Sequence, residues 1–221
     1  MKLNELDNKY IWHPYTHLTS RDNIVIQRAK DAILIDEKGN RFIDAISSWW
    51  VNIHGHRNKY ISNAIKRQLR KMEHVMFAGF THIPAINLSY RLLKHLPDEQ
   101  KKVFFSDNGS TAVEVGLKMG VQYFKNKGFN KINIIALENS YHGDTFGSMS
   151  VSERGVFTSA FSDMLFKVSF IELPDANNIR KLKYKLRKYV NDDSGNIFIY
   201  EPLVQGAGGM RIYCHEALGE L

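Results

Sequence analysis

The stretch VFFSDNGSTAVEVGLKMGV, residues 103–121, decides the fold prediction. Its first three residues, Val103–Phe105, are wholly apolar and predict a short strand. From Thr111 onward, apolar residues recur in a pattern typical of a mostly buried helix. Between the two, Gly109 permits a tight turn and Ser110 is a good residue for the N-cap of the helix.

A turn of this kind before a helix favours the binding of an anion. The first N–H groups of a helix have no partner within the helix, and the helix dipole places partial positive charge at the same end. We therefore interpret Gly109 and Ser110 as a cup for the phosphate of a cofactor. An ordinary capped helix that follows a strand fits the same residues equally well.

Three further strands are predicted from apolar runs at 132–137, 168–173 and 197–200, with Gly195 as a break before the last one. The runs alternate with helical patterns. This alternation predicts an α/β fold with a largely parallel sheet wrapped by helices.

Polar segments follow these strands. In parallel sheets a ligand lies beyond the carboxyl ends of the strands. We therefore expect the turn at Gly109, the loop at 141–143 and Glu201 to converge on one site, although they lie far apart in the sequence.

The N-terminal part of the chain has a different pattern. Residues 33–44 predict a β-hairpin with its turn at Gly39 and Asn40. Amphipathic helices are expected over 59–72 and 84–96. The adjacent Trp49 and Trp50 are costly to leave exposed, so we expect one to face the core and the other a cavity.

Composition sets limits on the type of protein. The chain has 221 residues, 43% of them hydrophobic, which is enough for a substantial globular core. The single cysteine, Cys214, forms no intrachain disulfide, and the N-terminus does not resemble a signal peptide, so we expect a reducing cytoplasm. No uninterrupted apolar run approaches the roughly 18 residues that a transmembrane helix needs, and we expect no membrane partner.

The formal charge of +7 is concentrated in one segment. In residues 179–190, basic residues alternate with apolar ones at helical spacing. We interpret this segment as an amphipathic surface helix with a solvated basic face. A patch that contacts nucleic-acid phosphates is the alternative, and we expect no nucleic-acid partner.

The sequence contains no motif for a metal site or a hydrolase. The histidines are scattered, and neither His-Glu-x-x-His nor Cys-x-x-Cys is present. A Gly-x-Ser-x-Gly nucleophile motif is also absent. We therefore predict no metal site.

Several segments appear in the order of one known family. They are IWHPYT (11–16), SSWW (47–50), DNGSTAVEV (107–115), YHGDTFG (141–147) and EPLVQGAGGM (201–210). Together they resemble the class III, pyridoxal-phosphate-dependent aminotransferases over nearly the whole chain. The tryptophan pair and the Trp-His-Pro-Tyr arm resemble the members of this family that act in biotin biosynthesis. Those enzymes convert 8-amino-7-oxononanoate to 7,8-diaminononanoate with S-adenosylmethionine as amino donor.

The resemblance implies a fold-type I transferase. Residues 1–56 would form the arm and hairpin of a small α+β domain, and residues 57–221 the first part of the large cofactor-binding domain. It also implies pyridoxal 5'-phosphate as cofactor and a homodimer in the complete enzyme.

The resemblance also assigns roles to individual residues. Gly109 and Ser110 would bind the cofactor phosphate, with the backbone N–H of Thr111 as an addition. Tyr141 would lie over the pyridine ring and also border the substrate. Trp49 and Tyr15 would contact the substrate chain. His142 and Glu201 would lie near the cofactor. A buried carboxylate bonded to backbone is the alternative for Glu201, and a locally satisfied loop histidine is the alternative for His142.

The resemblance assigns no catalytic residue to this chain. The family's cofactor-linking lysine and the aspartate that pairs with the pyridine nitrogen lie beyond Leu221. We therefore expect the 221-residue chain to be inactive alone, as a truncated form, the product of an interrupted gene or half of a split enzyme. Another class III aminotransferase acting on an ω-amino acid, and a non-catalytic fragment that acts as an interaction partner, are the alternatives.

Overall fold

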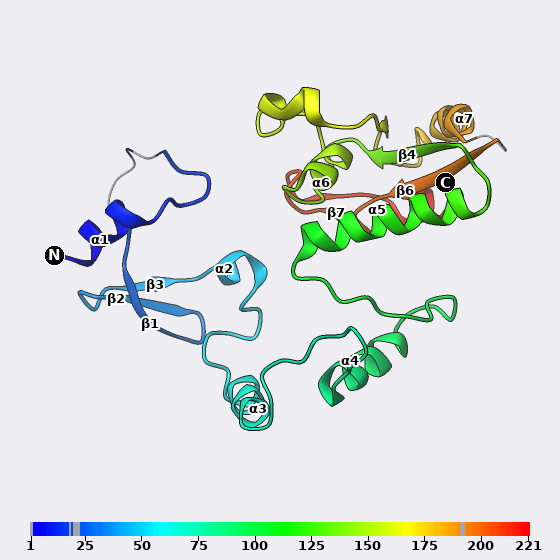
Figure 1. Ribbon diagram of the computed structural model, residues 1–221. Coiled ribbons are helices and arrows are strands. Elements are labelled where there is room, and N and C mark those ends of the chain that lie inside the picture. Colours follow the sequence, from blue (N-terminus) through cyan, green and yellow to red (C-terminus); the bar gives the residue numbers. More distant parts are fainter. Residues whose placement is uncertain (1, 18, 20–22, 191–192) are drawn as a thin grey trace. The chain divides into compact units, whose positions relative to one another are not determined.

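A computed structural model of the chain describes residues 2–17, 19, 23–190 and 193–221. The chain divides into two compact units, Met1–Asp98 and Glu99–Leu221. Each unit is described by itself (Figure 1). The predicted division of the complete enzyme after residue 56 stays a prediction.

The first unit contains a small antiparallel sheet. Its order is β1 (Ile26–Lys30), β2 (Ile33–Asp36) and β3 (Arg41–Ile43). The predicted hairpin is confirmed, because β2 and β3 pair antiparallel across a turn in which Gly39 has a φ of +86°. The carboxylate of Asp36 accepts hydrogen bonds from the backbone N–H groups of Lys38 and Asn40 and closes this turn.

The described residues of the first unit also form the helices α1 (Leu3–Tyr10), α2 (Ser47–Trp50), α3 (Lys59–Leu69) and α4 (Ile83–Leu93). The two predicted amphipathic helices are confirmed as α3 and α4, although each ends three residues earlier than expected. Asn58 caps α3 by accepting hydrogen bonds from the N–H groups of Tyr60 and Ile61. The ring of His82 accepts one from Ala85 at the start of α4.

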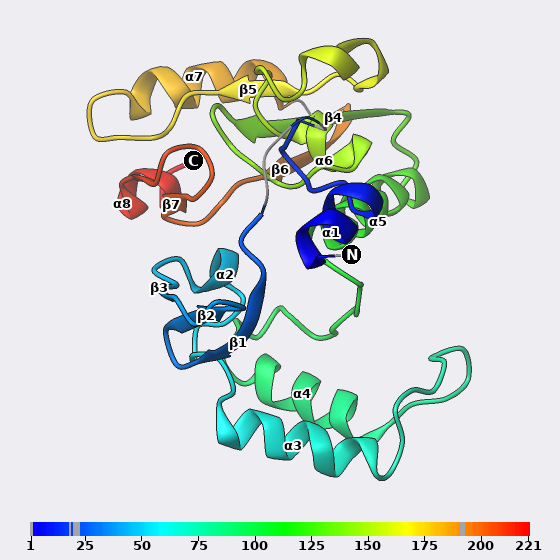
Figure 2. The same ribbon diagram turned by 90° about the vertical axis from the view of Figure 1, so that its left-hand side faces the viewer.

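The second unit contains the predicted parallel sheet. β4 (Lys131–Leu137) is central and pairs in parallel with β5 (Ser169–Ile171) and β6 (Ser194–Ile199). Helix α5 (Gly109–Asn126) packs against β6, and α7 (Ile179–Tyr189) packs against β5 (Figure 2). The remaining elements are α6 (Phe146–Val151), the 3-10 helix η1 (Ser159–Met164), β7 (Val204–Gln205), β8 (Arg211–Ile212) and α8 (His215–Gly219).

The core of the second unit lies between the sheet and α7. It contains Ile135, Leu137, Ile171, Leu182 and Tyr213. Since α7 buries Leu182 completely and carries its lysines on the outside, the segment is the amphipathic surface helix that the sequence predicted. Lys181 forms an ion pair with Glu172 at 2.8 Å, and Lys183 forms one with Glu220 at 2.6 Å.

Two expectations about the stretch 103–121 are wrong. Val103–Phe105 form no strand, since no described strand pairs with them, and Phe104 is 63% exposed. An apolar run becomes a strand only when its backbone groups find partners. The helix itself is confirmed but is not mostly buried: Leu117 is its one buried residue, and Met119 is exposed.

Gly195 is not a break, because it lies inside β6 and is paired with Ile132 of β4. A Cβ atom on Gly195 would lie 2.3 Å from Cγ of Phe124 on α5. The glycine therefore marks the place where the helix packs closely on the strand.

In the part of the chain that the structure describes, no helix has the length and apolarity needed to cross a membrane.

We predict that Gly195→Ala destabilises the second unit by roughly 1–3 kcal/mol, because the added methyl group overpacks the contact with Phe124. The measurement is hydrogen exchange of the β4 and β6 amides, which follows this unit separately from the first. Gly116→Ala on α5 is the control, since a Cβ atom there meets nothing within 4 Å. Equal protection in wild type and Gly195→Ala would contradict the prediction.

Candidate functional site

The N-terminus of α5 is capped by Asn108. Its Oδ1 accepts a hydrogen bond from the N–H of Thr111 at 3.0 Å, and Oγ1 of Thr111 accepts one from the N–H of Asn108 at 3.2 Å. The expectation that Ser110 is the N-cap is therefore wrong, and Ser110 is the second residue of the helix. Asn108 takes this position because its backbone is extended, with a φ of −159°, as a cap requires.

Two backbone N–H groups at this helix end are not used by the Asn108 cap. Among the described residues, nothing accepts a hydrogen bond from the N–H of Gly109 or Ser110. The N–H of Thr111 is already used by Asn108, so the cup consists here of Gly109 and Ser110. Gly109 does not have the positive φ that only glycine adopts easily, and a Cβ atom there would meet nothing within 4 Å.

The loop after β4 docks on this first helical turn. Oγ of Ser110 accepts a hydrogen bond from the N–H of Asp144 at 3.2 Å, and Oγ of Ser148 donates one to the Ser110 carbonyl at 2.9 Å. Gly143 is needed for the approach: its φ is +128°, and a Cβ atom would lie 2.1 Å from Oγ of Ser110. The loop and the cup therefore form one structure.

Glu201 joins this loop to the loop after β6. Its Oε1 accepts a hydrogen bond from the N–H of Tyr141, and its Oε2 accepts one from the N–H of Gly206, both at 3.0 Å. These contacts match the alternative for Glu201 in part, because the carboxylate is bonded to backbone but the residue is half-buried and not buried. They also confirm the predicted convergence, since Ser110, Tyr141 and Glu201 are connected through hydrogen bonds.

The Tyr141 side chain contacts its own loop and is partly exposed. Its hydroxyl donates a hydrogen bond to Oδ2 of Asp144 at 2.8 Å, and the residue is 41% exposed. The ring therefore lies on the loop that binds the first turn of α5, with part of its surface accessible to a ligand.

The ring of His142 is not satisfied locally. Its backbone N–H donates to Oγ of Ser152, but among the described residues the buried Nε2 atom has no hydrogen-bond partner. Burial lowers the pKa of His142, and the negative charge of Glu201 opposes this shift. The neutral form of the ring is therefore favoured.

Tyr15 and Trp49 meet in the first unit. Their ring centroids lie 5.7 Å apart in an edge-to-face arrangement. The expectation that one indole of the tryptophan pair faces the core is wrong, because Trp49 and Trp50 are 66% and 62% exposed. The four residues Ser47–Trp50 have φ values of 49°, 49°, 59° and 68°, which is a left-handed turn. Such a backbone costs about 1–2 kcal/mol for each non-glycine residue.

Asp44 stabilises this left-handed turn. Its carboxylate accepts hydrogen bonds from the N–H and the hydroxyl of Ser48, at 2.8 and 2.7 Å, and one from Nε2 of His56 at 2.7 Å. The Asp44 side chain is only 6% exposed. Sequence reasoning missed Asp44, and the one signal for it was the placement of a carboxylate three residues before the Ser-Ser-Trp-Trp segment.

The described residues contain no group of three or more His, Cys, Asp and Glu side chains that is suited to a metal ion. His13 contacts Asp7, and His56 contacts Asp44. Both pairs involve carboxylates that bind further donors in the protein, so neither points to a ligand.

The comparison with protein families decides the class. The model of the class-III aminotransferases matches residues 16–221.

The chain belongs to the class III aminotransferases.

Relatives and solved structures agree with this assignment. An adenosylmethionine-8-amino-7-oxononanoate aminotransferase of Synechococcus elongatus is 43% identical over 222 residues, covering 96% of this chain and 52% of the relative. The Staphylococcus aureus protein of the same name is 36% identical over 96% of this chain and 51% of its own length. This class III chain therefore spans about half the length of the curated relatives it matches.

The fold comparison gives the same result. The crystal structure of an adenosylmethionine-8-amino-7-oxononanoate aminotransferase from Methanocaldococcus jannaschii has a TM-score of 0.87 at 34% identity, over 99% of this chain and 50% of that one. A PLP-bound amine transaminase from an uncultivated Pseudomonas species has a TM-score of 0.85 at 28% identity, over 96% and 52%. The predicted fold-type I architecture is confirmed, and pyridoxal 5'-phosphate is the cofactor of this class.

The residues of this aminotransferase chain fit that cofactor. Two unengaged N–H groups and the Ser110 hydroxyl lie at the N-terminus of an 18-residue helix, which suits a phosphate. A partly exposed tyrosine ring lies on the loop bonded to the same turn, which suits a flat aromatic ring.

We predict that the pKa of Asp44 in this aminotransferase chain lies below its ordinary value of 3.8. The largest cause is the hydrogen bond from the Ser48 hydroxyl, followed by the bond from the Ser48 N–H and the bond from His56. A lowered pKa means that the ionised carboxylate stabilises the fold above pH 3.8. That contribution is lost as the pH falls through the folded-state pKa. The measurement is an NMR titration of the Asp44 carboxyl carbon.

Ser48→Ala removes the largest of these causes and should move the titration midpoint of Asp44 back toward 3.8. Thr16→Ala is the control, since the Thr16 hydroxyl donates to the carbonyl of His13 and not to Asp44. An unchanged midpoint in Ser48→Ala would show that the hydroxyl does not stabilise the charged carboxylate.

Proposed function

We propose that this chain is the N-terminal part of a pyridoxal-phosphate-dependent transaminase of biotin biosynthesis. The reaction is the conversion of 8-amino-7-oxononanoate to 7,8-diaminononanoate, with S-adenosylmethionine as amino donor. The connection of the Gly109–Ser110 cup to the Tyr141 loop through Ser110 and Asp144 is the observation that supports cofactor binding most directly. The names of the relatives at 43% and 36% identity support the choice of substrate.

The cup binds the cofactor phosphate. The N–H groups of Gly109 and Ser110 donate to it, and the Ser110 hydroxyl, which accepts from Asp144, still has its own proton to donate. Thr111 supports the cup through the cap with Asn108 and not through its N–H. The partial positive charge at the start of α5 favours the phosphate further.

Tyr141 would hold the flat ring of the cofactor. Glu201 fixes the backbone of Tyr141, and the neutral ring of His142 lies beside it in the loop without adding a charge. When bound, pyridoxal phosphate supplies an electrophilic carbonyl and an electron sink for amino transfer.

Tyr15 and Trp49 recognise the substrate chain. Both rings are largely exposed, and their edge-to-face contact presents an apolar surface suited to the methylene groups of an oxononanoate. The complete enzyme acts as a homodimer in a reducing cytoplasm, as the family resemblance and the single Cys214 suggest.

A second candidate is a class III aminotransferase that uses a simple amine or ω-amino acid. The likeness to the amine transaminase at a TM-score of 0.85 favours it. The identity to that protein is 28%, whereas the Synechococcus relative reaches 43%, so the biotin-pathway reaction is supported better.

We expect the 221-residue chain to bind pyridoxal phosphate without catalysing transamination. Co-expression with the C-terminal half of the Synechococcus relative, in a host that lacks 7,8-diaminononanoate synthesis, should restore growth without biotin, whereas neither half alone should. Turnover of 8-amino-7-oxononanoate by the purified chain alone would contradict the expected inactivity. Restored turnover of simple amines but not of 8-amino-7-oxononanoate would favour the second candidate.

We predict that Gly143→Ala weakens pyridoxal phosphate binding by roughly 10- to 100-fold. The methyl group would collide with Oγ of Ser110, and the loss corresponds to one charge-assisted hydrogen bond. The measurement is a titration followed by cofactor absorbance. Gly155→Ala is the control, because a Cβ atom there meets nothing within 4 Å. Equal affinity in Gly143→Ala and Gly155→Ala would rule out the proposed cup.

A further inference from the structure

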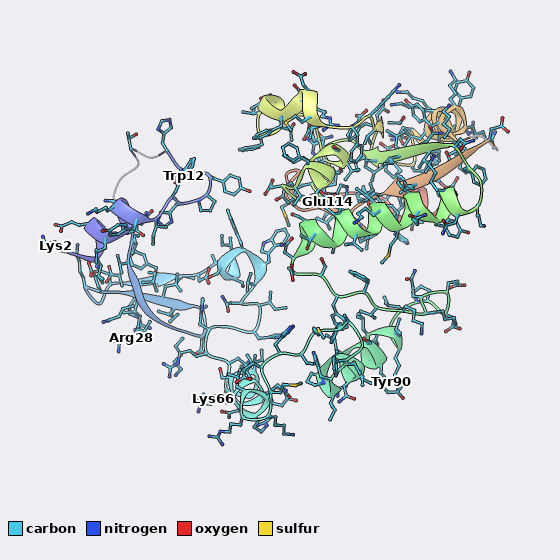
Figure 3. The ribbon with its side chains drawn as sticks, in the orientation of Figure 1. Lys2, Trp12, Arg28, Lys66, Tyr90 and Glu114 are labelled. Atoms are coloured by element: carbon cyan, nitrogen blue, oxygen red, sulfur yellow. The ribbon has the colours of Figure 1, made fainter. Side chains whose placement is uncertain are left out.

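Glu114 lies on α5 one helical turn after the cup residue Ser110 and has no part in the cap formed by Asn108. Its Oε1 accepts a hydrogen bond from the hydroxyl of Thr145 at 2.5 Å and another from the N–H of Gly147 at 2.7 Å. Figure 3 labels Glu114 in the region where α5 and α6 lie close together. The carboxylate therefore binds the loop that also carries Tyr141.

These bonds replace the usual cap of α6. Thr145 occupies the N-cap position of α6, but its hydroxyl makes no cap bond and donates to Glu114. The first N–H groups of a helix need acceptors, and Glu114 supplies one for Gly147 from another helix. The start of α6 is thus fixed on α5.

A side chain at Gly147 would displace the Glu114 carboxylate. A Cβ atom there would lie 2.1 Å from Oε2 of Glu114, and Gly147 is buried. The same tight approach occurs between Gly143 and Ser110. The loop is therefore attached to α5 at two points, and these lie four residues apart on the same face of the helix.

Two attachment points define the position of a loop better than one. Ser110 alone binds the segment through two hydrogen bonds, from the N–H of Asp144 at 3.2 Å and from the hydroxyl of Ser148 at 2.9 Å. The bonds to Glu114, at 2.5 and 2.7 Å, add a second point one helical turn further along, which limits rotation of the loop about Ser110. Tyr141 is tied to the same segment through its hydroxyl bond to Asp144.

We propose that Glu114 is a positioning residue, which sets the height of the Tyr141 ring above the Gly109–Ser110 cup. This inference rests on the proposed function, since the ring and the cup act together only when both contact pyridoxal phosphate. A cofactor fixed at its phosphate can stack on a ring only if the two sites are held within a fraction of an ångström of the right spacing.

The test compares two ligands in the full chain. Inorganic phosphate uses the cup alone, whereas pyridoxal phosphate uses the cup and the ring. In Glu114→Ala we expect the affinity for phosphate to stay within about twofold and the affinity for pyridoxal phosphate to fall about tenfold or more. Isothermal titration calorimetry measures both.

Hydrogen exchange measured on the same variants reports the loop itself. In Glu114→Ala, exchange of the Asp144 and Gly147 amides should accelerate about tenfold or more, while the β4 and β6 amides stay protected and show that the unit is folded. Glu114→Gln should show a smaller effect, because the amide oxygen can still accept from Gly147. Glu172→Gln, which removes a carboxylate paired with Lys181, is the control and should change nothing in the loop.

Unchanged loop exchange and unchanged affinity for pyridoxal phosphate in Glu114→Ala would overturn the inference. Equal losses of phosphate and pyridoxal phosphate affinity would also overturn it, because Glu114 would then support the cup and not the ring. If the wild-type chain binds pyridoxal phosphate no more tightly than inorganic phosphate, the proposed function is overturned and, with it, the cofactor role of Glu114. The exchange data would still report whether Glu114 fixes the loop.

Discussion

The parallel ladder between β4 and β6 runs from the pair Lys131–Ser194 to the pair Ala136–Ile199. Because the two strands point the same way, the loops that follow them emerge at the same edge of the sheet. Glu201 can therefore accept hydrogen bonds from Tyr141, 60 residues earlier, and from Gly206. If this pairing shifted, the loop that docks on α5 would move away from the cup.

The succession α5, β4, β5, α7 and β6 in the second unit could be predicted from the sequence, because each of these apolar runs lies between polar turns, whereas the short elements α6, η1, β7, β8 and α8 were not predicted. The hairpin was predictable for the same reason, since the chemistry of its turn is local. The first segment of the stretch 103–121 failed as a strand because strand formation depends on a pairing partner, which a local apolar pattern does not supply. The role of Gly195 was misjudged because the residue that requires a glycine there is Phe124, which lies 71 residues away on α5.

The candidate site was predictable only in part. Tyr141 and Ser110 could be named because they stand in segments that resemble a known family. Glu114 and Asp44 could not, because a carboxylate on a helix or after a strand looks like a surface charge until its donors are known. The donors to Glu114 lie 31 and 33 residues further along the chain. The cap of α5 was misplaced by two residues, since both Asn108 and Ser110 are good caps and only the backbone decides between them.

The left-handed turn at Ser47–Trp50 has a stereochemical consequence. A backbone that is strained for L-residues is relaxed for their mirror images, which prefer positive φ. In a chain assembled by chemical synthesis, D-serine at position 47 would adopt the observed φ of 49° without the cost that the natural residue carries. Among the described residues, the carboxylate of Asp44 accepts hydrogen bonds from Ser48 and not from the Ser47 side chain. A change of chirality at this one position would therefore separate the strain of the turn from the hydrogen bonds that offset it.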